Sequence, residues 1–202
     1  MFKLNKNIKT NRGMSYVELI VVLSIFSVLS SMAIYNYGAF QANVDMKNLA
    51  SDIALKIVEA QKSSLNGVLP LAGAPFLEWK PSYGVYFNIT TPEQFIYFAD
   101  LDQDGVLYNP DCSTTNSECL DKITITKGNK ILRIEKCTDS ACPPFDSDSI
   151  SSFSVSFKRP NSSAIFSGAS LTGSEYIKIT IKSPKDNTSF IKVYPSGRIQ
   201  IN

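Results

Sequence analysis

Two hydrophobic patterns follow each other in the first 66 residues. Residues 19 to 44 form a run of 26 without a charged side chain, and its most apolar part is 19–35. About 20 such residues cross a bilayer as a helix. Between residues 43 and 65, apolar side chains return near helical spacing and charged ones occupy other positions, which is typical of an amphipathic helix with one buried face. The apolar positions of this second pattern are Leu49, Ile53, Ile57, Val58 and Leu65.

Both patterns fit a single helix from about residue 15 to residue 65, roughly 75 Å long at 1.5 Å per residue. Asn66 and Gly67 supply a stop signal at its end. Gly38 is a weak point in the middle, because a glycine costs roughly 1 kcal/mol in a helix interior. We therefore divide the chain into a leader (1–13), a helix (14–66) with a membrane-spanning part (19–35) and an amphipathic part (43–65), and a head (67–202).

Short runs of alternating polarity fill the chain beyond residue 81 and predict β-strands. They read YGVYFNI, QFIYFAD, KITITK, KILRIEK, SSFSVSFKR, EYIKITIK and SFIKVYP. Before them, GVLPLAGAPFLEWKP has no period and predicts a loop. KGNK predicts a tight hairpin turn between the third and fourth runs, and FIKVYPSGRIQIN predicts a last hairpin that turns at 195–197. The expected fold class is α+β, a long N-terminal helix packed on a C-terminal antiparallel β-sheet head.

Charge is distributed unevenly along the chain. The first thirteen residues contain no acid and four bases, namely Lys3, Lys6, Lys9 and Arg12. Subtracting these four from the 20 basic residues leaves 16 against 18 acidic ones, so part of the basic charge belongs to a leader. A basic segment before an apolar run predicts a cytoplasmic N-terminus and an exported head. The sequence contains no histidine, which excludes Ser-His-Asp and Cys-His catalysis.

Four cysteines, Cys112, Cys119, Cys137 and Cys142, lie on the side predicted to be exported. An even number in that setting predicts two disulfides. Sequential pairing gives Cys112–Cys119 and Cys137–Cys142, and nested pairing gives Cys119–Cys137 and Cys112–Cys142. A zinc site is the alternative, but the spacing lacks paired C-x2-C knuckles.

The segment DLDQDGVLYNPD, residues 100 to 111, resembles a calcium-binding loop in its spacing. Carboxylates stand at loop positions 1, 3, 5 and 12, a glycine stands at position 6, and a backbone carbonyl at position 7 would add a further oxygen. Calcium takes six to eight oxygen ligands, and the glycine permits the sharp turn. The candidate ligands are Asp100, Asp102, Asp104, Val106 and Asp111. The other interpretation is a solvated acidic turn.

Glu18 is the one carboxylate at the head of the apolar run, where an unpaired charge is costly. Together with the basic leader, Gly13, Met14 and the long apolar helix, it resembles the cleavage signal of type IV prepilins and pseudopilins. The resemblance implies that a prepilin peptidase cuts after Gly13 and methylates Met14. It also implies that Glu18 neutralises the N-terminal amine of a neighbouring subunit. The chain departs from the usual pattern by having Met14 instead of Phe, and Tyr35 where many pilins have Pro.

We therefore predict a structural subunit, a minor pilin or pseudopilin of a type IV pilus or type II secretion-like fibre, and not an enzyme. Its head is similar to H-type pseudopilins and minor pilins. The resemblance implies other pilin or pseudopilin subunits, in a homo- or hetero-polymer, together with the peptidase and a membrane assembly platform as partners. The subunit would be held in the cytoplasmic membrane and then assembled into an extracellular or periplasmic fibre. The alternative is a single-pass membrane-anchored, calcium-stabilised extracellular binding domain.

The last hairpins are rich in basic residues, which could bind the phosphates of DNA. Their bases are Lys178, Lys182, Lys185, Lys192 and Arg198. We interpret them as a solvated strand face and do not expect a DNA partner, because such a pattern is common on exposed strands.

Overall fold

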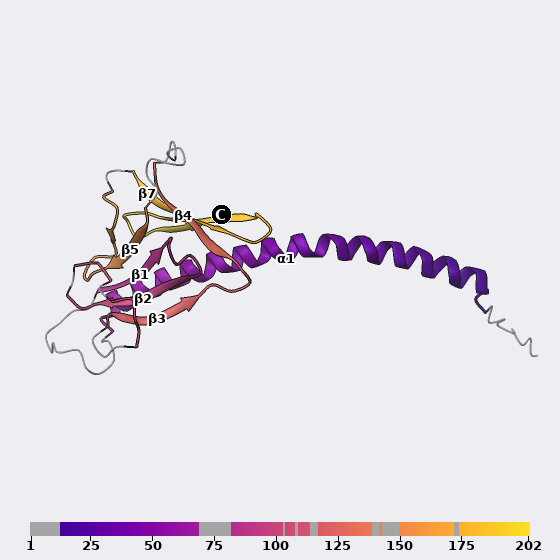
Figure 1. Cartoon of the computed structure of the whole chain (residues 1–202), viewed down its shortest axis with the longest axis horizontal. Helices are drawn as coiled ribbons and strands as arrows, with labels where there is room; N and C mark the ends of the chain where they lie inside the picture. Colours follow the sequence, from indigo (N-terminus) through magenta and orange to yellow (C-terminus); the bar gives the residue numbers. More distant parts are fainter. Residues whose placement is uncertain are drawn as a thin grey trace, which may run out of the picture. The chain divides into compact units, whose positions relative to one another are not determined.

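One helix is followed by nine strands in the part of the chain that the computed structural model describes (Figure 1). The described residues are 13–68, 82–102, 104–107, 109–113, 117–138, 142, 150–171 and 174–202. The chain divides into two compact units, residues 1–41 and 42–202. The helix, α1, spans Tyr16–Asn66 and contributes to both. Most of the leader and the central part of the predicted loop, residues 69–81, lie outside the described residues.

Helix α1 ends at the predicted stop signal. The N–H of Gly67 donates to the carbonyl of Ser64 at 3.1 Å, and the N–H of Val68 donates to the carbonyl of Ser63 at 3.1 Å. These two bonds form a Schellman motif, in which the residue at position C′, here Gly67, adopts the left-handed conformation. Gly67 has a φ of +63° and meets this requirement. The helix continues through Gly38, so the weak point predicted there is not a break.

The strands form two antiparallel sheets. The first sheet has the order β3-β2-β1-β5-β6 and the second has the order β4-β7-β8-β9. The bounds in the first sheet are β1 Ser82–Asn88, β2 Gln94–Asp100, β3 Cys119–Thr124, β5 Ser152–Phe157 and β6 Ala164–Ser167. Those in the second are β4 Lys130–Cys137, β7 Tyr176–Lys182, β8 Thr188–Val193 and β9 Ile199–Ile201. A long apolar helix followed by an antiparallel β domain is thus the observed architecture, with two sheets in place of the expected one.

The predicted hairpin at KGNK is wrong as a strand pairing. A tight turn is present, with φ of +62° at Lys127 and a hydrogen bond from Asn129 N to Thr126 O at 3.3 Å. However, β3 pairs with β2, and β4 pairs with β7. The reason is that the residues on either side of the turn form hydrogen bonds with the segment before β2. Ile125 N donates to Glu93 O at 2.7 Å, and Ile131 N donates to Pro92 O at 2.8 Å.

The buried face of α1 combines bulky and small side chains. Met46, Ala50, Ile53, Ile57 and Ala60 recur at spacings of four and three residues, and each is at most 2% exposed. Small side chains at such positions let a sheet approach the helix closely. Two of the predicted core positions, Ile53 and Ile57, are confirmed, whereas Leu65 is 39% exposed because it falls off this stripe.

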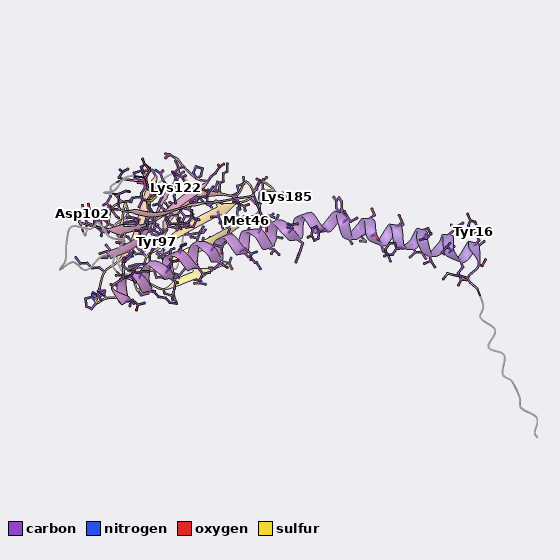
Figure 2. All side chains as sticks on the ribbon, turned by 90° about the horizontal axis from the view of Figure 1, so that it is seen from below. Tyr16, Met46, Tyr97, Asp102, Lys122 and Lys185 are labelled. Atoms are coloured by element: carbon purple, nitrogen blue, oxygen red, sulfur yellow. A yellow bond between two sulfur atoms is a disulfide. The ribbon has the colours of Figure 1, made fainter. Side chains whose placement is uncertain are left out.

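One hydrophobic core joins the helix to both sheets. The first sheet contributes stacked aromatic rings, with centroids 6.1 Å apart for Tyr83 and Tyr97 and 5.7 Å apart for Phe87 and Phe95. The second sheet contributes aliphatic side chains, which are Ile131, Ile134, Ile177, Ile179, Ile181, Ile191 and Val193. Met46 of α1, labelled in Figure 2, belongs to the same core.

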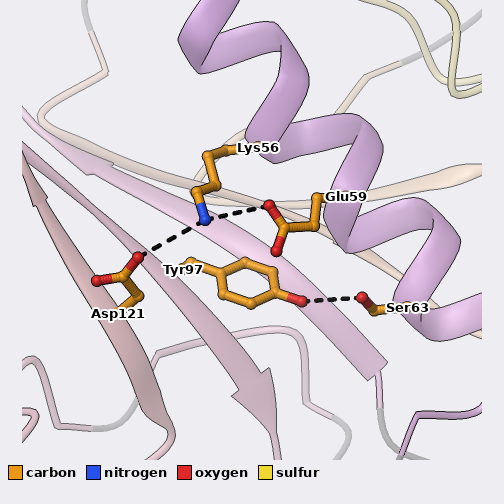
Figure 3. A network of polar contacts seen from close by, with 5 residues as sticks. All are labelled: Lys56, Glu59, Ser63, Tyr97 and Asp121. Carbon is orange, nitrogen blue, oxygen red and sulfur yellow. Dashed lines mark hydrogen bonds and ion pairs between the residues drawn. The ribbon is translucent and has the colours of Figure 1, made fainter.

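A polar network fastens α1 to the edge of the first sheet (Figure 3). Lys56 Nζ lies 3.1 Å from Glu59 and 3.6 Å from Asp121 on β3, and it also sits 5.4 Å from the ring centre of Tyr97. Burial alone would lower the pKa of Lys56, but the hydrogen bonds and charges of Glu59 and Asp121 raise it above its ordinary value. The Tyr97 hydroxyl and the hydroxyl of Ser63 share a hydrogen bond of 3.1 Å.

Replacing Ile53 by Ala should lower the free energy of unfolding by about 2–5 kcal/mol, because the side chain is fully buried between helix and sheets. Urea unfolding of the full chain in detergent, followed by near-UV circular dichroism, measures the change. Leu55→Ala is the matched control: Leu55 lies on the same helix but is 64% exposed, so its loss should stay below about 0.5 kcal/mol. Equal losses for both variants would contradict the packing described.

Candidate functional site

The N-terminal part of α1 has an apolar surface that the other described residues do not cover. The large apolar side chains between residues 14 and 40 are 44% to 87% exposed. They are Met14, Tyr16, Val17, Leu19, Ile20, Val21, Val22, Leu23, Ile25, Phe26, Val28, Leu29, Met32, Ile34, Tyr35, Tyr37 and Phe40. None of the most apolar 18-residue window is buried, and the helix is long and apolar enough to cross a membrane. A helix that is hydrophobic all round needs an apolar environment.

The residues of the predicted processing signal lie together at the start of this helix. Gly13 and Met14 precede α1, and a side-chain carbon added to Gly13 would meet no other atom within 4 Å. Met14 is 63% exposed. Glu18 lies in the first turn, where it is exposed and where the helix dipole favours a negative charge. Among the described residues, Gly13, Met14 and Glu18 are thus all exposed.

The acidic loop that follows β2 folds back over the outer face of the first sheet. Leu107 from the loop packs with Ile96 and Phe98 of β2 and with Cys119, forming a small second core. Gly84 on β1 makes room for it, because a side-chain carbon there would come within 2.6 Å of the Phe98 ring. The Ser154 hydroxyl on β5 donates a 2.6 Å hydrogen bond to the Gly105 carbonyl, which fastens the loop to the sheet.

Three carboxylates meet where this loop leaves the sheet. Ligand oxygens of Asp100, Asp102 and Glu118 all lie within 4.8 Å of one another. Asp100 is 1% exposed and Glu118 is 4% exposed. An Asp100 oxygen accepts a hydrogen bond from Gly105 N at 3.1 Å, and a Glu118 oxygen accepts one from Leu101 N at 2.8 Å. Two buried negative charges this close repel each other, and oxygen ligands of this kind suit a hard cation such as calcium.

Glu118 was not among the predicted ligands. It lies beside Asp100 because the residues before β3 continue the pairing with β2, with Ala99 N donating to Glu118 O at 2.9 Å. The next residue, Cys119, forms a disulfide with Cys112, which joins the end of the acidic loop to the start of β3. Only the register of two strands distant in sequence reveals this carboxylate.

The other predicted ligands lie outside this group of three. Asp104 accepts a hydrogen bond from Val106 N at 2.7 Å, and Val106 itself is 40% exposed. Asp111 is exposed and accepts hydrogen bonds from the Ser113 hydroxyl at 2.8 Å and the Ser113 N–H at 3.1 Å. These bonds, and to a smaller extent the charge of Lys122, lower the pKa of Asp111. Asp104 and Asp111 therefore shape turns of the loop.

The disulfides have the sequential pairing, Cys112–Cys119 and Cys137–Cys142, with Cα atoms 4.8 Å and 4.4 Å apart. The first closes the acidic loop next to the carboxylates. Beside it lies a shallow cavity of about 270 Å³. Its lining consists of Tyr86, Asn88, Thr91, Gln94, Ile96, Pro110, Asp111 and Lys122.

Two features of the described chain thus stand out as functional candidates: the uncovered apolar helix with its terminal carboxylate, and the acidic cluster beneath the loop. Comparison with protein-family models, with curated proteins and with solved structures finds no match for this chain. The residues and their geometry are therefore the basis for assigning a function.

Proposed function

We propose that the chain is a structural subunit, a minor pilin or pseudopilin, of a type IV pilus or type II secretion-like fibre. The observation that carries the proposal is the apolar surface of α1, which the chain leaves exposed beside a single carboxylate, Glu18. Before assembly, the cytoplasmic membrane covers this surface. After assembly, the same surface is covered by α1 helices of neighbouring subunits.

Processing between Gly13 and Met14 creates the partner of Glu18. Cleavage by a prepilin peptidase leaves a positively charged amine on Met14, four residues before the carboxylate. A charge buried alone in an apolar setting costs several kcal/mol, and pairing with an opposite charge offsets much of that cost. If the amine of one subunit pairs with Glu18 of the next, the pair also sets the axial offset between subunits.

The head supports an exported location. Two disulfides close loops in it, and such bonds persist in oxidising compartments outside the cytosol. The basic leader holds the N-terminus in the cytoplasm, next to the assembly platform with which we expect the subunit to engage. A single-pass membrane-anchored binding domain shares these features, but it has no need of Glu18 or of a cut after Gly13.

Replacing Glu18 by Gln should leave membrane insertion and cleavage intact while reducing the assembled fraction by about tenfold or more, because each subunit contact loses a buried charge pair. Electron microscopy and sedimentation of sheared fibres measure assembly, and membrane fractionation measures insertion. Glu18→Asp should recover part of the assembly. Asp52→Asn, at an exposed carboxylate farther along the same helix, is the matched control. Unchanged assembly in Glu18→Gln would contradict the proposal.

We propose a second role, for the acidic cluster. Asp100, Asp102 and Glu118 hold a calcium ion, and Ser154 keeps the loop above it by its bond to Gly105. The ion would offset the repulsion of the buried carboxylates and so stiffen the loop. Extracellular calcium sites of modest affinity bind in the range of about 0.1–1 mM, which suits an exported head.

Calcium at about ten times its dissociation constant should stabilise the full chain in detergent by about 1.4 kcal/mol, which corresponds to a rise of about 3–6 °C in Tm. Asp102→Ala should remove this shift, because it removes one of the three ligands. Asp186→Ala, in the turn between β7 and β8, is the control and should keep the shift. Scanning calorimetry with and without calcium measures both. A wild-type Tm that calcium leaves unchanged would exclude the site.

A further inference from the structure

The outer face of the second sheet combines cations with aromatic rings. Ile177, Ile179 and Ile191 point into the core and are fully buried, so the residues that alternate with them on β7 and β8 point outward. We call six residues of this surface the cationic–aromatic face; Tyr194 and Arg198 follow β8, and Tyr176 is itself only 5% exposed. It consists of Tyr176, Lys178, Phe190, Lys192, Tyr194 and Arg198.

Each cation on this face rests on a ring. Lys178 Nζ lies 4.9 Å from the ring centre of Phe190, and Lys192 Nζ lies 4.6 Å from that of Tyr176. The Arg198 guanidinium lies 3.9 Å from the ring centre of Tyr194. Cation–π contacts of this kind are worth about 0.5–1 kcal/mol at exposed sites. They hold the three charges in place, which reduces the conformational entropy that a partner must freeze on binding.

The three cations of this face contact rings and not carboxylates, although other described lysines such as Lys62 and Lys158 also form no ion pair. Among the described residues, none of Lys178, Lys192 and Arg198 forms an ion pair with a carboxylate. By contrast, Lys56, Lys127, Lys136, Lys182 and Arg133 each have one. Moreover, Lys178 and Lys192 stand directly opposite each other in the register of β7 and β8. Like charges in that position repel each other, although Lys178 also stands opposite Glu135 of β4 on its other side. An anionic partner would add further negative charge beside the two lysines.

The same chain carries a surface of opposite charge. Residues 100 to 118 contain five acids and no base. Asp102, Asp104 and Asp111 are exposed there, on the outer face of the first sheet. A calcium ion would reduce the charge of this acidic loop from −5 to −3, which is still strongly negative. Figure 1 shows β4 and β7 of the second sheet on a different side of the head from β2 and β3.

We propose that the cationic–aromatic face of one copy docks on the acidic loop of the next copy. This inference rests on the fibre function proposed above and names the contact between the heads. Subunits in a helical fibre repeat by rotation and translation, so any head-to-head contact must join two different surfaces of the subunit. Two surfaces of opposite charge on separate faces of the head satisfy that condition. They also disfavour contacts between two basic faces or between two acidic loops, which would bring like charges together.

The rings on this face favour a protein partner over a nucleic acid. Bases bind single-stranded sites by stacking on open ring faces. The Tyr194 ring instead has Arg198 at 3.9 Å and the Tyr176 ring at 5.1 Å, and the rings of Phe190 and Tyr176 carry lysines. The rings are therefore occupied by cation–π contacts, and the cations remain available to carboxylates of a protein partner.

The test is zero-length crosslinking of assembled full-length chain, prepared from equal parts of ¹⁵N-labelled and unlabelled protein. A carbodiimide joins lysines to carboxylates in direct contact, and mixed-isotope peptides identify links between copies. We expect links from Lys178 or Lys192 to Asp104 or Asp111, weakened at high salt because the contact is electrostatic. A photo-crosslinker at Phe26 reports helix contacts in the same sample. Helix links without face-to-loop links would overturn the docking while leaving the fibre proposal intact. The absence of both would overturn the docking between copies, and the Glu18→Gln assembly measurement would then decide the fibre proposal separately.

Charge reversal sharpens the test. Lys178→Glu combined with Lys192→Glu should reduce face-to-loop links and fibre yield by about tenfold, and adding Asp104→Lys with Asp111→Lys should restore the yield. Lys62→Glu with Lys158→Glu makes the same change of charge at exposed positions outside the face and should have little effect. Circular dichroism of each variant in detergent verifies the fold. The proposal would be overturned if the folded four-fold variant, with both lysines and both aspartates reversed, did not recover fibre yield. It would also be overturned if no links formed between copies, while the wild-type protein bound a DNA duplex and the variant with both lysines reversed did not.

Discussion

An apolar helix surface that its own chain leaves uncovered is the constraint on which the rest of the structure depends. A side chain such as Phe26 or Ile34, more than two thirds exposed, loses about 25 cal/mol for each Å² of apolar area left in water. Over residues 14 to 40 this cost favours an apolar environment around the helix. A lone carboxylate at the start of such a surface is costly in that environment until an opposite charge meets it. The insertion, processing and assembly proposed above are therefore three ways of meeting one physical requirement.

The C-terminal half of α1 has a second role, because it forms part of the core of the head. Ala50 and Ala60 flank Ile53 and Ile57 on the buried stripe of the helix, and the aromatic sheet and the aliphatic sheet share one core with it. The ion pair between Asp45 and Lys127, 2.6 Å long, joins the helix to the turn between β3 and β4. The core and this ion pair tie residues 45 to 60 firmly to the head. The acidic loop and the cationic–aromatic face are then free to carry contacts, because neither contributes to the main core.

The elements follow closely from local patterns, and the errors come where distant segments decide. Helix α1 and its Gly67 cap are predictable because period and cap chemistry are local. The seven alternating runs are strands for the same reason, although the short, half-exposed β6 has too weak a pattern to be seen. KGNK fails because Pro92 and Glu93 bond to both flanks of the turn. Glu118 is missed because only strand register places it beside Asp100, and the spacing of the cysteines alone leaves both disulfide pairings open.

Mass spectrometry of the N-terminus of the mature protein, isolated from the membrane of a host that supplies prepilin peptidase, tests the central claim most directly. The account predicts a chain that begins at Met14 and carries one methyl group on its amine, because Glu18 needs that amine as its partner in a neighbouring copy. A chain that retains Met1, or one cut beyond Ala33 so that Glu18 is removed, would contradict it.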